Sequence, residues 1–161
     1  MRSSRSGFTL LEVLVVLVLI GIVAAFAMPG LGGLGQRRMA ATADTLAAAF
    51  NEARDGAVLA NHPLGIVLAS DGYALLRHDG TRWSIDEGTT GGRHRFPEDI
   101  RLLAGQGYPR LEQLPAAPAP QAVFLPDGTS EAPGWQLGRE TGPVFGLRTL
   151  ENGRYAAGRL R

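Results

Sequence analysis

The chain has 161 residues, of which 45% are hydrophobic, with 22 Gly, 10 Pro and no Cys. The missing cysteines exclude a disulfide framework and a thiolate metal site. All 16 basic residues are Arg, 15 residues are acidic, and the formal net charge of +1 gives no general electrostatic case for binding nucleic acid or anionic lipid. The length beyond an N-terminal apolar segment suits one domain of ordinary size.

The first predicted element is an apolar run over residues 8–28, in which Glu12 is the only charged residue. As a helix, its 21 residues would span roughly 30 Å, the thickness of a bilayer core. Arg2 and Arg5 precede the run, and the positive-inside rule then predicts a cytoplasmic N-terminus. The run is therefore a candidate single-pass membrane helix. The alternative is a secretory signal peptide with its small-residue cleavage site at residues 25–27.

A stretch rich in Pro and Gly, residues 29–35, follows the apolar run. Pro29 removes a helical hydrogen bond, and each Gly costs up to about 1 kcal/mol relative to Ala inside a helix. Two interpretations stay open. The stretch is either a simple linker or a hinge that lets the helix bend during assembly.

An Ala-rich helix is predicted over residues 36–61, because small and apolar residues recur at spacings of three and four. Its charged and polar side chains, Asn51 among them, fall mostly on the opposite side. The helix should end at Asn61, because His62 directly precedes Pro63 and the residue before a proline avoids the α region. We expect its apolar stripe to pack on a sheet.

The remaining residues, 64–161, show strand patterns. Asp-Gly turns separate the first three predicted strands and favour a three-stranded meander. The Pro-rich residues 105–120 predict an exposed loop, and Arg93, His94 and Arg95 predict a solvated strand face. We expect an α+β domain, with one N-terminal helix on about seven short antiparallel strands. The predicted strands are residues 64–69, 73–77, 81–85, 100–103, 123–125, 135–137, 143–150 and 154–160.

The residues at the start of the apolar run form a specific motif, Gly7-Phe8-Thr9-Leu10-Leu11-Glu12. This motif resembles the class III signal of type IV pilins and type II secretion pseudopilins. In that family a basic leader ends in Gly, Phe is the first mature residue, Glu is the fifth and Pro is the twenty-second. Gly7, Phe8, Glu12 and Pro29 fall at these positions.

The resemblance implies a pilin-like fold, in which the first half of a long N-terminal helix crosses the bacterial inner membrane. It implies a leader over residues 1–7 and a periplasmic domain over residues 36–161. A prepilin peptidase would cut after Gly7, and Phe8 would be N-methylated. Glu12 would pair with the free amine of a neighbouring Phe8, because a lone carboxylate in lipid is unfavourable and a cation beside it offsets this cost.

Two further stretches, residues 38–61 and 124–129, resemble the minor pseudopilin H of the type II secretion system. Related minor type IV pilins share these motifs but often carry a C-terminal disulfide, which a chain without cysteine cannot form. The resemblance implies a structural subunit at the pseudopilus tip, or between tip and shaft, that supports export of folded proteins across the outer membrane. The implied partners are the other minor pseudopilins, the major pseudopilin, the prepilin peptidase and the inner-membrane assembly platform. The alternative is a minor type IV pilin for pilus assembly or DNA uptake.

The sequence contains no recognisable catalytic motif. His62, His78 and His94 lie outside any G-x-S-x-G, HExxH or phosphate-loop pattern, so we expect no enzyme, no cofactor and no metal. Binding of nucleic acid is also not expected. The only candidate for a DNA-binding stripe is a set of four residues that we expect to be a solvated strand face: Arg148, Arg154, Arg159 and Arg161.

Overall fold

The computed structural model describes residues 10–27, 31–88, 92–103 and 107–160. The chain divides into two compact units, residues 1–37 and residues 38–161. The first unit contains helix α1 (Leu10–Ala27) and the first turns of helix α2 (Leu31–Ala60). The second unit contains the rest of α2 and all of the strands, and is called the domain below.

Helix α2 starts at Leu31 rather than at Gln36, which corrects the predicted start. Gly33 and Gly35 are therefore helical. A Gly weakens a helix by up to about 1 kcal/mol, which is small for a helix of 30 residues whose later turns are stabilised by packing. The helix ends at Ala60, one residue before the predicted end. Asn61 has a φ of 53°, a left-handed conformation that commonly follows a helix.

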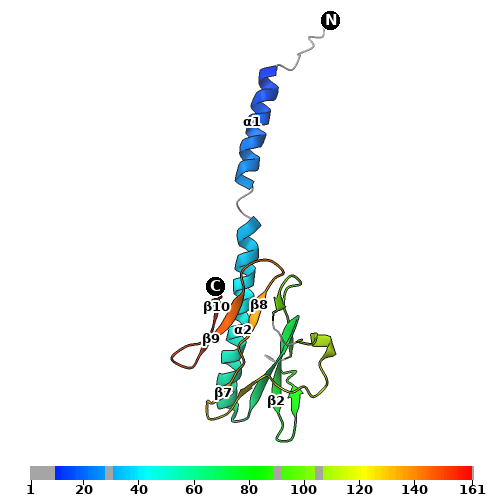
Figure 1. Ribbon diagram of the computed structural model, residues 1–161, viewed down its shortest axis with the longest axis vertical. Coiled ribbons are helices and arrows are strands. Elements are labelled where there is room, and N and C mark those ends of the chain that lie inside the picture. The colour runs from blue at the N-terminus through cyan, green and yellow to red at the C-terminus, as the bar shows by residue number, and fades with distance from the viewer. Residues whose placement is uncertain (1–9, 28–30, 89–91, 104–106, 161) are drawn as a thin grey trace, which may run out of the picture. The chain divides into compact units, whose positions relative to one another are not determined.

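The strands form two antiparallel sheets, both of which lie beside α2 in Figure 1. The order of the first sheet is β3-β2-β1-β6-β7, with β4 also paired to β2; that of the second is β10-β9-β8-β5. The predicted meander β1-β2-β3 is confirmed, whereas β7, a strand of only two residues, was not predicted. The first sheet contains β1 (Leu64–Ala69), β2 (Gly72–His78), β3 (Trp83–Ile85), β4 (Arg93–Arg95), β6 (Ala122–Phe124) and β7 (Ser130–Glu131). The second contains β5 (Arg101–Leu102), β8 (Gln136–Gly138), β9 (Phe145–Thr149) and β10 (Tyr155–Arg159).

One hydrophobic core joins α2 to both sheets. The predicted apolar stripe of α2 is confirmed, because all of its members are buried there. Phe50 lies at the centre of an aromatic group, with its ring centroid 5.9 Å from that of Phe124 and 5.6 Å from that of Tyr155. Small alanines on the same stripe let the sheets approach the helix closely. The buried stripe consists of Met39, Ala43, Leu46, Phe50, Ala53 and Ala57.

A second apolar cluster covers the other face of the first sheet, and it corrects the prediction for residues 105–120. The segment was expected to be an exposed loop. Instead it contains a short 3-10 helix, η2 (Leu111–Gln113), and buries Leu111 and Leu114 against β1 and β2. Proline prevents regular strand pairing, but it does not prevent a turn from burying apolar side chains. Strand β1 is consequently buried on both faces.

The first hairpin differs from its predicted turn. Ala69 pairs with Gly72, so the turn residues are Ser70 and Asp71 rather than Asp71 and Gly72. Gly72 is instead required by close packing, because an added Cβ would collide with the carbonyl oxygen of His94 and with the Leu111 side chain. In the later Asp-Gly and Asn-Gly pairs only the glycine has a positive φ, at Gly80, Gly128 and Gly153.

Candidate assembly site

The predicted N-terminal motif is only partly within the described residues. Gly7, Phe8 and Pro29 lie outside them, as does the leader. Glu12 lies in the first turn of α1, and its side chain is exposed. A carboxylate is favoured at this end of a helix, because the first turn carries the positive end of the helix dipole. The roles assigned to these four residues stay predictions.

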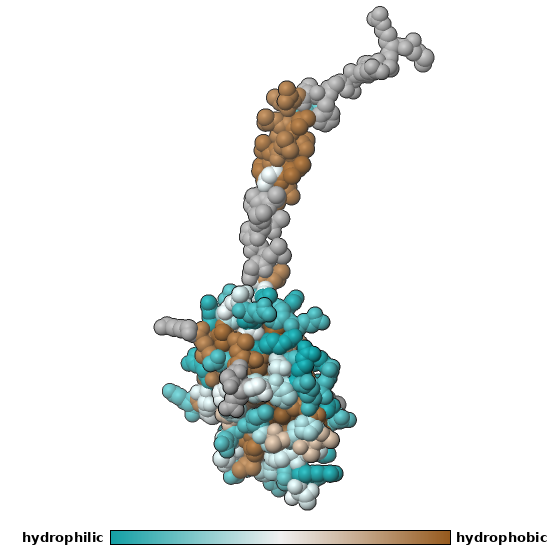
Figure 2. Space-filling model, turned by 45° about the vertical axis from the view of Figure 1, so that its right-hand side comes forward, coloured by the Kyte–Doolittle hydropathy of each residue, from teal (hydrophilic) through white to brown (hydrophobic). Residues whose placement is uncertain are grey.

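Apart from Glu12, the described side chains of α1 are apolar, and they are exposed on every side of the helix. They appear as the mainly brown surface of this helix in Figure 2. Residues 10–23 are all exposed, and a helix that is apolar all round requires lipid or other helices to cover it. By the usual measure of length and apolarity, none of the helices in the described residues qualifies as a membrane span.

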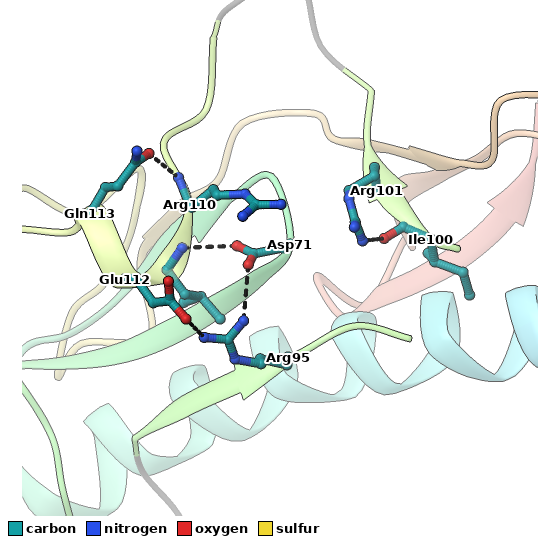
Figure 3. Close-up of polar contacts among 8 residues, drawn as sticks. Asp71, Arg95, Ile100, Arg101, Arg110, Glu112 and Gln113 are labelled. Carbon is teal, nitrogen blue, oxygen red and sulfur yellow. Dashed lines mark hydrogen bonds and ion pairs between the residues drawn. The ribbon is translucent and has the colours of Figure 1, made fainter. Parts of the chain in front are cut away.

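Asp71 organises the polar cluster in Figure 3, and it is the only charged side chain that is buried in the described ranges. Its Oδ1 accepts a hydrogen bond from the backbone N–H of Leu111 at 2.8 Å, and its Oδ2 accepts one from Arg95 Nη1 at 3.3 Å. The second guanidinium nitrogen of Arg95 contacts Glu112. The Asp71 carbonyl also accepts the Phe96 N–H at 2.9 Å. The turn between β1 and β2, which contains Asp71, therefore holds both η2 and the end of β4.

This cluster changes the prediction for Arg93, His94 and Arg95. Arg93 is exposed as expected, whereas Arg95 is ion-paired to Asp71 and Glu112. His94 is half-buried, and its ring stacks on Tyr73 with 4.8 Å between centroids. The side chains differ because β4 pairs with β2, so that successive residues face opposite sides of the sheet.

A second polar contact ties α2 to the second sheet. The Asn51 side chain donates to the Tyr155 carbonyl at 2.8 Å and accepts the Tyr155 N–H at 2.9 Å. Nearby, Arg154 Nη2 lies 3.1 Å from Asp55 Oδ2. We had predicted that Asn51 lies on the solvent-facing side of α2. The structure instead bonds its side chain to Tyr155. The one sequence signal was an Asn amid alanines, since Asn is a poor helix former.

That ion pair also weakens the case for a DNA-binding stripe. Arg154 is engaged by Asp55, and Arg161 lies outside the described residues. The remaining pair, Arg148 and Arg159, lies on neighbouring strands. Two arginines on a near-neutral domain are too few to attract a polyanion.

Two grooves of different charge flank α2 within the domain. The acidic groove encloses about 620 Å³, and its ionisable lining residues are Glu52, Asp55, Asp86 and Arg154. The arginine groove encloses about 440 Å³, and its lining residues are Arg38, Ala41, Thr42, Thr45, Tyr73, Arg93, His94, Arg95, Phe96 and Pro97. Among these described lining residues, neither groove brings a histidine together with a carboxylate, the pair that general acid–base chemistry most often uses.

The domain matches a known family over most of its length. Residues 42–153 match the family described as Type II transport protein GspH. The chain belongs to this GspH family. Its N-terminal residues 2–28 also match the prokaryotic N-terminal methylation motif. The match includes Gly7, Phe8 and Glu12, and the resemblance drawn from these residues is confirmed at the level of the family.

Individual relatives of this GspH family member agree with that assignment. The type II secretion system protein H of Pseudomonas aeruginosa is 33% identical over 141 residues, covering 80% of this chain and 79% of the relative. Two structures of the minor pseudopilin EpsH from the type II secretion system of Vibrio cholerae have TM-scores of 0.58 and 0.57. They cover 76% and 75% of this chain, and 97% and 93% of their own chains, at 14% and 16% identity. The predicted α+β pilin-like fold is thereby confirmed.

Proposed function

We propose that this chain is a minor pseudopilin, a structural subunit of a type II secretion pseudopilus. In this proposal it lies at the tip or joins the tip to the shaft, and it supports export of folded proteins across the outer membrane. The observation that carries the proposal is the union of two matches in one chain, the methylation motif over residues 2–28 and the GspH region over residues 42–153. A structural role rather than a catalytic one is part of the proposal.

In this proposal the N-terminal segment is first a membrane anchor and, after processing, an assembly helix. Residues 8–28 first anchor the protein in the inner membrane, with the N-terminus in the cytoplasm and residues 36–161 in the periplasm. The prepilin peptidase then cuts after Gly7, and Phe8 is N-methylated. Supporting this, the apolar run in the sequence has the length of a bilayer core, and Arg2 and Arg5 precede it.

Assembly follows from Glu12 and Pro29 in this proposal. The Glu12 carboxylate pairs with the methylated amine of Phe8 in a neighbouring subunit, so that each charge is neutralised as the helix leaves lipid for a helical bundle. Pro29 acts as a hinge between the anchor and the domain. The neighbours are the major pseudopilin and the other minor pseudopilins, and the inner-membrane assembly platform inserts the subunit.

The deciding measurement is the intact mass of the protein extracted from its native membrane. A chain that begins at Phe8 and carries one additional methyl group is expected, because it records prepilin processing. A chain that begins at Met28 would instead record removal of the apolar run by signal peptidase. That outcome would make the protein a free periplasmic domain and would overturn the proposal.

The secretion role has its own test. Deleting the gene should leave folded secreted proteins in the periplasm, and the native chain should restore their export. A deletion strain that secretes normally but loses surface pili or DNA uptake would identify a minor type IV pilin instead.

A further inference from the structure

The arginine groove lacks acidic lining residues, although the sequence surrounds Arg93 with acids. Three of these acids have other positions or partners. Asp99 Oδ2 lies 3.1 Å from Arg139 Nε, Glu112 contacts Arg95, and Asp86 lines the acidic groove. As a result, no carboxylate lies among the residues that line the arginine groove in the described part of the domain.

Arg38 and Arg93 are consequently the uncompensated charges of this groove. Both side chains are exposed, and neither forms an ion pair in the described residues. All 15 acidic residues of the chain lie within the described ranges. Arg95 differs, because Asp71 and Glu112 already hold its guanidinium.

The two threonines near Arg38 form hydrogen bonds within the helix. Thr42 Oγ1 donates to the Arg38 carbonyl at 2.9 Å, and Thr45 Oγ1 donates to the Ala41 carbonyl at 2.8 Å. Tyr73 and Phe96 are the aromatic residues other than His94 in the groove lining. The groove is thus lined by two arginines, Arg38 on α2 and Arg93 on β4, together with apolar residues. This combination suits an ionised carboxylate on a short aliphatic stem.

We propose that the arginine groove receives an Asp or Glu side chain from a neighbouring subunit of the filament, held by Arg38 and Arg93. This inference rests on the proposed function, which brings the domains of neighbouring subunits together. A polyanion fits less well. Without Arg2, Arg5 and Glu12 the chain has 16 − 2 = 14 Arg and 15 − 1 = 14 acids, and so has no broad positive field. The groove of about 440 Å³ has room for side chains rather than for a nucleic acid strand.

The composition of the chain makes this contact directly testable, because it contains no lysine. In the full-length protein, Arg93→Lys or Arg38→Lys places a single reactive ε-amine in the groove and preserves the charge. A carbodiimide then joins that amine to any carboxylate in contact, without a spacer. The reaction is run in native membranes, and the product is mapped by mass spectrometry. Arg77→Lys is the matched control, since Arg77 is exposed on β2, forms no ion pair with another described residue and lies outside both grooves.

The expected result is a crosslinked product for Arg93→Lys and Arg38→Lys, in which the new amide joins the lysine to an Asp or Glu of another pseudopilin. The unsubstituted chain and Arg77→Lys should lack this product. Arg93→Glu should also reduce the amount of co-isolated neighbouring subunit by about fivefold, the scale of one exposed ion pair, whereas Arg77→Glu should not. Crosslinks only within the chain, equal crosslinking of the control, or an effect of Arg93→Glu solely on binding to anionic phospholipid vesicles would overturn the inference.

The unsubstituted protein separates this inference from the proposed function. If it co-isolates with other pseudopilins while the groove lysines give no intermolecular product, the groove assignment is wrong and the function stands. If the unsubstituted protein co-isolates with no pseudopilin, both are overturned.

Discussion

Helix α1 and the domain use apolar side chains in opposite ways. Leu17 of α1 is 63% exposed, whereas Phe50 of α2 is 0% exposed. Full burial of a large apolar side chain stabilises by about 1.5–3 kcal/mol. The domain obtains this stabilisation from its own chain, while α1 must obtain it from lipid or from other helices. Substitutions in the two regions should therefore change different measurements.

The largest expected effect is on the stability of the domain. Phe50→Ala removes the ring that contacts Phe124 and Tyr155, and should lower the free energy of unfolding by about 3–5 kcal/mol. Leu17→Ala should change it by less than about 0.5 kcal/mol. Urea unfolding of the full-length protein in detergent measures both. Equal losses for the two variants would mean that α1 contributes to the same cooperative unit.

Next comes the buried carboxylate of Asp71. Asp71→Ala removes the acceptor of the Leu111 N–H and one partner of Arg95, and should cost about 1–3 kcal/mol. Asp71→Asn should cost less, because the amide oxygen still accepts the Leu111 N–H. Urea unfolding gives the free energies, and amide hydrogen exchange at Leu111 reports local opening. Unchanged exchange in Asp71→Ala would contradict the role of this turn in holding η2.

The corresponding test in α1 is Glu12→Ala, which should leave the unfolding of the domain unchanged. We expect the variant to remain in the membrane but to enter the filament roughly tenfold less, equivalent to about 1.4 kcal/mol. Quantitative co-isolation with the major pseudopilin is the measurement, and Glu12→Gln is the control that keeps the side-chain shape. Normal incorporation of both variants would remove Glu12 from the assembly mechanism.

The smallest effect, absent at neutral pH, concerns Tyr73. Burial, together with the charge of Glu52, raises the pKa of Tyr73 to about 12 from 10.0. The phenol is thus held neutral in the folded state and loses its proton more easily when unfolded. Its contribution to stability is complete below about pH 10 and is lost as the pH rises towards about 12. Urea unfolding at about pH 9 and about pH 11 should show this loss in the native chain and a smaller one in Tyr73→Phe, while equal losses would contradict it.

Some features of the site were not predicted, because they join residues that are far apart in the sequence. The stripe from Met39 to Ala57 and the β1–β3 meander depend on residues close in sequence, and both were predicted. Asn51 and Tyr155 are 104 positions apart, and Asp71 and Arg95 are 24 apart. No periodicity links such pairs, so their polar side chains were assigned to the surface.

By itself, the sequence determined the division of the chain into an apolar N-terminal helix and an α+β domain, and it supplied the motif at Gly7, Phe8, Glu12 and Pro29. Helical and strand periodicities are local properties, and a short motif is read directly. The tertiary structure alone decided that Leu111 is buried and that Asp71 holds two segments. It also decided that Arg38 and Arg93 share a groove free of acidic lining residues in the described domain. These features depend on which strands pair and on which charges the fold brings together.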